Sequence, residues 1–282
     1  MKSLIELIVE IARIPSFSSF EERIHPYIFK QLNSVTGAKH TLVGDRNIVA
    51  SLPGNTRKSP IGLTAHLDKI NHFEETPPSE LPTEYGLSTI KGQLDDSVGL
   101  GILLHLAGSA EYNDWPPLYL LMSEMEESFG LKHHHELLRS GGEGLYNGMG
   151  ADKISDHLIN NGIDLQSVIT IDTTPIFRGD QGVALYTGHW EYTKTEPSAE
   201  EAQATSLLKE QMLKIDPGLY LSNNTNDYLT YGKRLNKHFE YPVPSIALEP
   251  AIHPYHQKDE QVYVADIHRT VTILKEYLNN YA

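Results

Sequence analysis

The sequence contains no cysteine in its 282 residues. This absence excludes disulfide bonds, thiolate nucleophiles and zinc sites built from cysteine. It is also consistent with a reducing compartment, where disulfides do not persist. Any metal site in this protein must therefore be built from histidine, aspartate or glutamate side chains.

Long uncharged apolar runs are missing as well. No window approaches the roughly 18 apolar residues that a membrane span requires. At the N-terminus, acidic residues interrupt the apolar ones at the spacing of an amphipathic helix rather than a signal peptide (Leu4, Ile5, Glu6, Ile8, Val9, Glu10). We therefore expect a cytoplasmic protein with no secretory signal and no membrane partner.

Basic residues are scarce compared with acidic ones. The chain has 23 lysines and arginines against 37 aspartates and glutamates, and a formal net charge of -14. This charge argues against nucleic acid or an anionic membrane as a partner, because both repel an acidic protein. Small or cationic substrates remain open.

Short apolar runs alternate with helical patterns along most of the chain. Such alternation predicts an α/β fold with a largely parallel sheet and helices on both faces. The clearest expected strands are 61–67, 117–122 and 168–172, and the expected helices between and after them are 97 to about 110 and 152–160. Further expected strands are 47–52, 183–186 and 245–248.

Capping patterns mark several expected helices. Three Ser/Glu pairs have the capping-box spacing: Ser3 with Glu6, Ser19 with Glu22, and Ser198 with Glu201. The helix after the second pair is expected to run to about Leu32, and the helix after the third pair to about Leu213. A closing helix is expected from about Asp266, and 69–87 is expected to be a surface loop.

Metal-binding side chains stand at the ends of the expected strands. His66 ends the first, Glu126 and Glu127 follow the second, and Asp172 ends the third. The carboxyl ends of parallel strands meet at one edge of a sheet, where ligands bind. These four side chains are therefore expected to converge.

Two adjacent acids, Asp95 and Asp96, precede an apolar helix and require a cation or hydrogen-bond donors if they are buried. With them, the candidate metal ligands are His66, Asp95, Glu127, Asp172 and His256. These donors suit zinc, manganese or cobalt, and five ligands suit two ions better than one. If Asp95 bridges, each ion also receives one histidine and one carboxylate, and a water between the ions becomes a nucleophile whose proton Glu126 could accept.

The order of these residues resembles that of a known family. The matching motifs are His66-Leu-Asp68, Leu94-Asp95-Asp96, Glu126-Glu127, Asp172 and His256-Gln-Lys-Asp-Glu260. They are similar to the motifs of the dinuclear zinc exopeptidase superfamily, which includes aminopeptidases, carboxypeptidases and amino-acid deacylases. The resemblance spans most of the chain and implies two divalent metal ions, zinc first, with cobalt or manganese as alternatives.

The resemblance also implies a role for each matching residue. His66, Asp95 and Asp172 would hold one metal, and Asp95, Glu127 and His256 the other. Glu126 would be the general base, Asp68 would orient the imidazole of His66, and the peptide between Asp95 and Asp96 would be cis.

Several alternatives stay open at this point. Asp96 could face the metals in place of Asp95, and His253 competes with His256, whose spacing to Glu260 matches the family. Each motif taken alone also has an ordinary explanation, such as a helix cap for the aspartate pair.

For the fold, the resemblance implies a three-layer sandwich of the phosphorylase and zinc-exopeptidase type, with a central mostly parallel mixed sheet. The interval between Asp68 and Asp95 is too short for the extra β-domain of tetrahedral aminopeptidases, and no dimerisation lid is evident between Asp172 and His256. We expect one catalytic domain over 1–282, with elaborated loops at about 69–92, 131–150 and 175–245.

For function, these features predict a hydrolase that cleaves amide bonds in small peptides. It would be a metallopeptidase, a metal-dependent protease, and most simply an aminopeptidase. The alternative is a carboxypeptidase or N-acyl amino-acid deacylase, and a non-catalytic binding module is a third option. Asp227 lies where aminopeptidases carry a Gly-Thr-Asp element near the substrate, and Arg178 could hold a substrate carboxylate. The sequence leaves the oligomeric state open, a homo-oligomer included.

Overall fold

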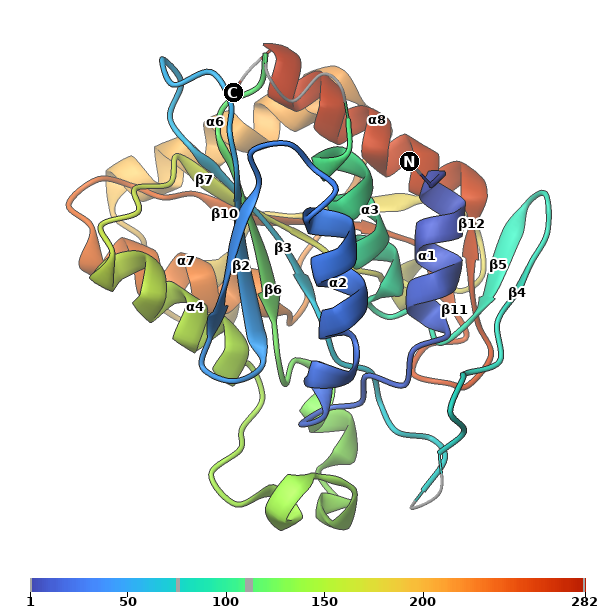
Figure 1. Cartoon of the computed structure of the whole chain (residues 1–282). Coiled ribbons are helices and arrows are strands. Elements are labelled where there is room, and N and C mark those ends of the chain that lie inside the picture. Colours follow the sequence, from blue (N-terminus) through green and yellow to red (C-terminus); the bar gives the residue numbers. More distant parts are fainter. Residues whose placement is uncertain (1, 75–76, 110–113, 281) are drawn as a thin grey trace.

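The computed structural model describes residues 2–74, 77–109, 114–280 and 282. A mixed sheet of eight strands forms its centre, with α-helices on both faces (Figure 1). In spatial order the strands are β1 (Lys39–Val43), β2 (Asn47–Leu52), β6 (Leu118–Ser123), β3 (Ile61–His66), β7 (Ser167–Ile171), β10 (Ser245–Pro250), β8 (Val183–Tyr186) and β9 (Tyr220–Ser222). The predicted three-layer α/β sandwich is confirmed.

Parallel pairing joins the central strands β6, β3, β7 and β10, while β2 pairs antiparallel with β6 and with β1, and β8 with β10. Every residue of β3 is buried. This is expected of a parallel strand with helices on both sides, and it explains why such strands read as continuous apolar runs.

A second, antiparallel sheet lies beside the first and carries two of the candidate ligands. Its strands, in spatial order, are β11 (Ile252–His253), β12 (Glu260–Tyr263), β5 (Thr89–Gly92) and β4 (Glu84–Tyr85). Asp95 follows β5, and His256 lies between β11 and β12. The sequence did not predict this sheet, because its strands are short and the pairing of β5 with β12 joins residues more than 150 positions apart.

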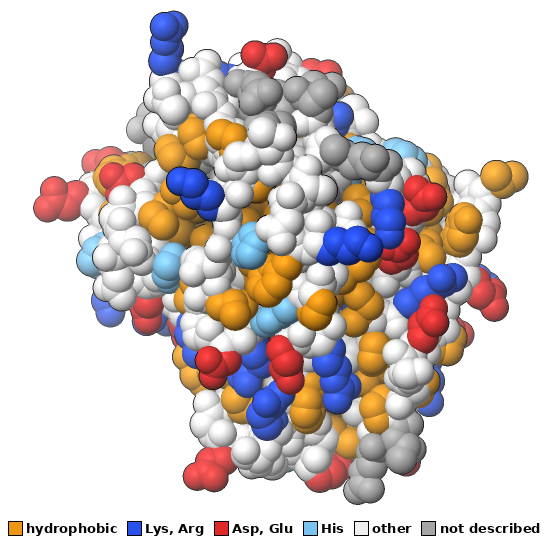
Figure 2. Space-filling view, viewed as in Figure 1, with side chains coloured by type: hydrophobic (Ala, Val, Ile, Leu, Met, Phe, Trp, Pro, Cys, Tyr) orange, Lys and Arg blue, Asp and Glu red, His pale blue; other side chains and the backbone are white. Residues whose placement is uncertain are grey.

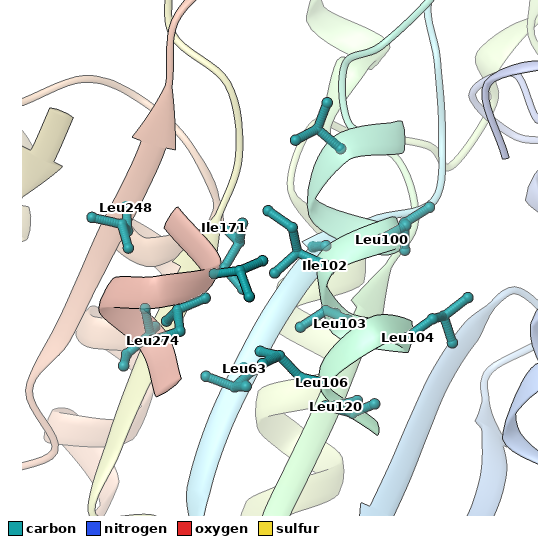
Figure 3. Close-up of a cluster of buried hydrophobic side chains, with 14 of the residues drawn as sticks. Leu63, Leu100, Ile102, Leu103, Leu104, Leu106, Leu120, Ile171, Leu248 and Leu274 are labelled. Atoms are coloured by element: carbon teal, nitrogen blue, oxygen red, sulfur yellow. The ribbon is translucent and has the colours of Figure 1, made fainter. Parts of the chain in front are cut away.

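The helices form two layers, each over its own hydrophobic core. One layer contains α1 (Leu4–Ala12), α2 (His25–Leu32), α3 (Ser97–Ala107), α6 (Ala199–Ile215) and α8 (Val264–Asn280), and the other contains α4 (Met149–Asn160), α5 (His189–Thr193) and α7 (Asp227–His238). Figure 3 shows Leu103 and Leu106 of α3 beside Leu63 and Leu120 of the sheet. Among the described residues, no helix is both long and apolar enough to cross a membrane.

Close packing of α1 against α3 depends on Gly101. A Cβ atom at this position would lie 2.3 Å from Cγ1 and 3.2 Å from Cα of Ile8. Gly101→Ala would gain up to about 1 kcal/mol of helix propensity, but overpacking costs about 1–3 kcal/mol and the Ile8 backbone cannot yield without separating the helices. We therefore expect a lower free energy of unfolding in urea. Gly86→Ala, at a glycine with no neighbour within 4 Å, is the control, and equal stability of the two variants would contradict this packing.

Most predicted elements are present, and some of their bounds differ. The capping box of Ser3 and Glu6 and the cap at Ser198 are confirmed. The capping box at Ser19 is wrong: this residue has a φ of 70° and precedes a short 3-10 helix, η1 (Glu21–Arg23). Its hydroxyl instead accepts a hydrogen bond from the distant Arg139 N–H. The helix expected to about Ala110 ends at Ala107, and Ala110 lies outside the described residues.

Acidic and basic side chains are interspersed over the face shown in Figure 2. The net charge of -14 is therefore not gathered into one patch on this face. A group of buried acids lies instead at the carboxyl edge of the central strands, where the candidate ligands converge.

Candidate metal centre

The ends of three adjacent parallel strands supply the first part of the site. His66 is the last residue of β3 and is in register with Ser123, the last residue of β6. Asp172 directly follows β7, and its Oδ1 lies 3.7 Å from Nε2 of His66. The predicted convergence at this edge is therefore observed.

Asp95 reaches the same point from the turn between β5 and α3. Its Oδ1 lies 3.2 Å from Nε2 of His66, and its Oδ2 lies 3.8 Å from Nε2 of His256. The two oxygens of one carboxylate thus face two histidines from different sheets. Glu260 holds this turn, since its Oε2 accepts hydrogen bonds from the N–H groups of Leu94 (2.7 Å) and Asp95 (3.2 Å).

Asp96 has a different position from Asp95. The peptide between them is cis, as the family resemblance implied. Asp96 is the N-cap of α3, and its Oδ1 accepts a hydrogen bond of 2.6 Å from the N–H of Gly99. Its Oδ2 is buried without a hydrogen-bond partner, and a ligand atom of Asp96 lies within 4.8 Å of those of His66 and Asp172. Both aspartates are therefore within reach of a cation.

His256 closes the site from the second sheet. Its Nε2 lies 3.2 Å from Oε2 of Glu127 and is buried without a hydrogen-bond partner. The competing His253 is exposed, and its ring lies beside Gly179. The structure brings His256, and not His253, to the carboxylates.

Asp68 connects the ends of β3 and β6. Its carboxylate accepts hydrogen bonds of 3.0 Å from the N–H groups of Glu126 and Glu127, and one of 2.7 Å from the hydroxyl of Ser18. Nδ1 of His66 lies 3.0 Å from the carbonyl oxygen of Asp68 and 3.5 Å from its carboxylate. Asp68 thus fixes the backbone of the glutamate pair in addition to facing the imidazole.

A buried polar network lies behind the glutamate pair. Glu124, buried after β6, pairs with Arg46, which also lies 3.0 Å from Oε2 of Glu21. Oε1 of Glu21 accepts a hydrogen bond of 3.1 Å from the N–H of Met125, which has a φ of 64°. The network therefore fixes the backbone immediately before Glu126.

The electrostatics of the cluster favour added positive charge. Burial raises the pKa values of Asp95, Glu126 and Glu127, and the neighbouring acids add to the effect. Burial alone would lower the pKa of His66, but hydrogen bonds to Asp172, Asp68 and Asp95 raise it well above its ordinary value. A proton on His66 or a bound cation would supply the missing positive charge.

The donor set fits divalent cations that take nitrogen and oxygen ligands. Within the described part of the chain, no lysine or arginine forms an ion pair with Asp95, Glu127 or Asp172. The ligand atoms of His66, Asp95 and Glu127 lie within 4.8 Å of one another. Together with the unpartnered Nε2 of His256, this arrangement provides several buried donors, and none of the described lysines or arginines forms an ion pair with those of Asp95, Glu127 or Asp172.

The two candidate substrate residues lie in contrasting surroundings. Asp227, at the start of α7, is buried and accepts a hydrogen bond from the hydroxyl of Ser123. Burial raises the pKa of Asp227 to about 7. Arg178 is exposed after the short 3-10 helix η6 (Pro175–Phe177), and its guanidinium makes no ion pair with any described residue. Asp227 therefore belongs to the buried polar surroundings of the site, and Arg178 does not.

No protein-family model and no curated protein sequence matches this chain significantly. Solved structures do match over nearly its whole length. An aminopeptidase from the archaeon Desulfurococcus kamchatkensis has a TM-score of 0.66 at 16% identity, covering 98% of this chain and 94% of its own. The TET1 peptidase of Pyrococcus horikoshii has a TM-score of 0.65 at 13% identity, and the match covers 99% of this chain and 100% of the TET1 chain. A tripeptidase from Staphylococcus aureus has a TM-score of 0.64 at 13% identity, and the match covers 98% of this chain and 97% of the tripeptidase.

At these identities the similarity establishes the fold. The chain has the fold of peptidases and aminopeptidases, as the resemblance of its motifs to the zinc exopeptidases implied.

Proposed function

We propose that this chain is a metal-dependent exopeptidase that removes the N-terminal residue from small peptides. The observation that carries the proposal is the position of Asp95, whose two carboxylate oxygens face His66 and His256. This arrangement supports two divalent cations, zinc in our proposal, with Asp95 between them. Asp172 would complete the site on the His66 side and Glu127 the site on the His256 side.

The bound cations would supply Lewis acidity and lower the pKa of water. Glu126 is suited to act as general base, because it is partly exposed while its neighbour Glu127 is buried. It would take a proton from the water that adds to the peptide carbonyl and pass it to the amine when the C–N bond breaks. Asp68 would keep Glu126 in place through its backbone N–H.

We further propose that 1–282 acts as one catalytic unit. The proposed ligands come from β3, β7, the turn after β5, the turn after β6 and the segment between β11 and β12. Neither half of the chain holds all of the proposed ligands, so an isolated half would lack activity.

Acidic surroundings favour an amino-terminal substrate over the carboxylate that a carboxypeptidase or deacylase must bind. Asp227 and Glu249 are both buried near the cluster, whereas the candidate cation Arg178 is exposed. With zinc-loaded protein, we expect turnover of aminoacyl anilides and tripeptides, no turnover of N-acetyl amino acids, and loss of activity in chelator that returns with zinc. Turnover of the acetylated set alone would contradict the aminopeptidase assignment.

A further inference from the structure

A cavity of about 370 Å³ adjoins the candidate metal centre, and of the proposed ligands His256 lines it. His256 belongs to both: its Nε2 faces Glu127, and its ring lines the cavity. One wall continues from Asp68 into residues 70–74, and the other continues from Glu127 into 130–137. Both segments project from the same end of the central sheet in Figure 1. Each wall of the cavity therefore begins close to a residue of the candidate metal centre.

Side-chain hydrogen bonds fix the first wall. Gln93 Nε2 donates a hydrogen bond of 2.7 Å to the carbonyl of Ile70, and Asn71 bridges the N–H of Phe73 (2.8 Å) and the carbonyl of Glu74 (2.9 Å). The cavity is therefore bordered by ordered backbone on this side.

The second wall packs directly against the first. A Cβ atom at Gly130 would lie 2.7 Å from Cδ1 of Ile70, so the absence of a side chain lets the walls meet at this point. Ile70 and Leu131 are buried at the contact, and Leu137 lies partly exposed farther out. The floor of the cavity is apolar.

The polar lining carries little charge. Burial lowers the pKa of His72 to about 4, so its imidazole is neutral near pH 7, and its Nε2 is buried without a hydrogen-bond partner. His134 pairs with Glu136, which leaves Glu74 as the charged group among the described lining residues. An anionic side chain in the cavity would be repelled by the carboxylate of Glu74.

Another cavity, of about 620 Å³, is larger but does not share these features. It is lined by α1, α2 and the segment around Glu80, and none of the proposed metal ligands borders it. It therefore does not adjoin the proposed metal ligands.

We propose that the cavity beside His256 is the pocket that receives a bulky, uncharged side chain of the substrate residue next to the cleaved bond. This inference rests on the proposed function and adds the substrate class. Leucine and phenylalanine side chains would bury their apolar surface against Ile70, Leu131 and Leu137, whereas alanine would leave the cavity unfilled and glutamate would be repelled.

Leu137→Trp tests the pocket by filling it from its partly exposed side. His133→Trp is the control, because His133 is exposed nearby and does not line the cavity. Tripeptides X-Ala-Ala and Ala-X-Ala, with X as Ala, Leu, Phe or Glu, are compared by kcat/KM. In the wild type we expect Leu and Phe at one of these positions to exceed Ala by about 10- to 100-fold, from the apolar surface buried, and Glu to fall below Ala.

The Leu137→Trp variant should reduce this preference to within about twofold, and His133→Trp should keep it. Turnover without a preference, or a preference unchanged in folded Leu137→Trp, would overturn the pocket. If no peptide is cleaved, the proposed function fails, and calorimetric titration with phenylalaninamide decides the pocket separately. Binding that is at least tenfold weaker in Leu137→Trp than in His133→Trp would support it, and equal or absent binding would overturn it.

Discussion

Glu126→Gln is expected to lower kcat for peptide hydrolysis by about 10²–10⁴-fold, the usual contribution of a general base. Glutamine has nearly the same shape and keeps the backbone N–H that donates to Asp68. It cannot accept the proton from water. Steady-state kinetics measure the loss, and the metal content of the same preparation should equal that of the wild type.

The matched control is Glu136→Gln, which removes an exposed carboxylate from the same part of the chain. Its kcat should stay at the wild-type value. Full activity in Glu126→Gln would exclude the residue as base, and loss of metal from that variant would make Glu126 a ligand instead.

Asp95→Asn is expected to weaken metal binding on both sides of the site and to abolish activity. The amide lacks the negative charge, and only one of its two terminal atoms can coordinate a cation. The loss of affinity should exceed the roughly 10–100-fold that is typical when an outer hydrogen-bond partner of a metal ligand is removed. Equilibrium dialysis followed by metal analysis measures it.

Asp96→Asn separates the two adjacent acids. Asparagine keeps a side-chain oxygen that can cap α3, so this variant should fold, bind metal and retain most activity. The close approach of Asp96 to His66 and Asp172 makes the opposite result informative. Metal loss in Asp96→Asn with metal retained in Asp95→Asn would assign Asp96 as the ligand.

Parallel strands are the part of this fold that the sequence predicted well. The expected strand 47–52 coincides with β2 and 183–186 with β8, while β3, β6 and β7 begin or end within a residue or so of the expected bounds. Burial on both faces produces continuous apolar runs that need no knowledge of distant partners. Because the strand ends follow from these runs, the meeting of His66 and Asp172 could be predicted as well.

Features that depend on distant parts of the chain were not predictable in this way. Helix α7 was not anticipated, and Ser19 was wrongly assigned as a helix cap because its hydroxyl is engaged by Arg139, 120 residues away. Asp95 and His256 were candidate ligands from their chemistry, but the strand pattern did not place them, since a second sheet built from two distant segments, 84–92 and 252–263, carries them. Glu21, Arg46 and Glu124 likewise come from separate parts of the chain and meet only after folding.

Anomalous X-ray scattering from zinc-loaded crystals would test the proposed site most directly, because it counts the ions and locates each one. We predict two zinc ions per chain with the carboxylate of Asp95 between them, one beside His66 and Asp172 and the other beside Glu127 and His256. A single ion, no ion after zinc loading, or two ions that leave Asp95 without a contact would contradict the dinuclear site and the peptidase mechanism that depends on it.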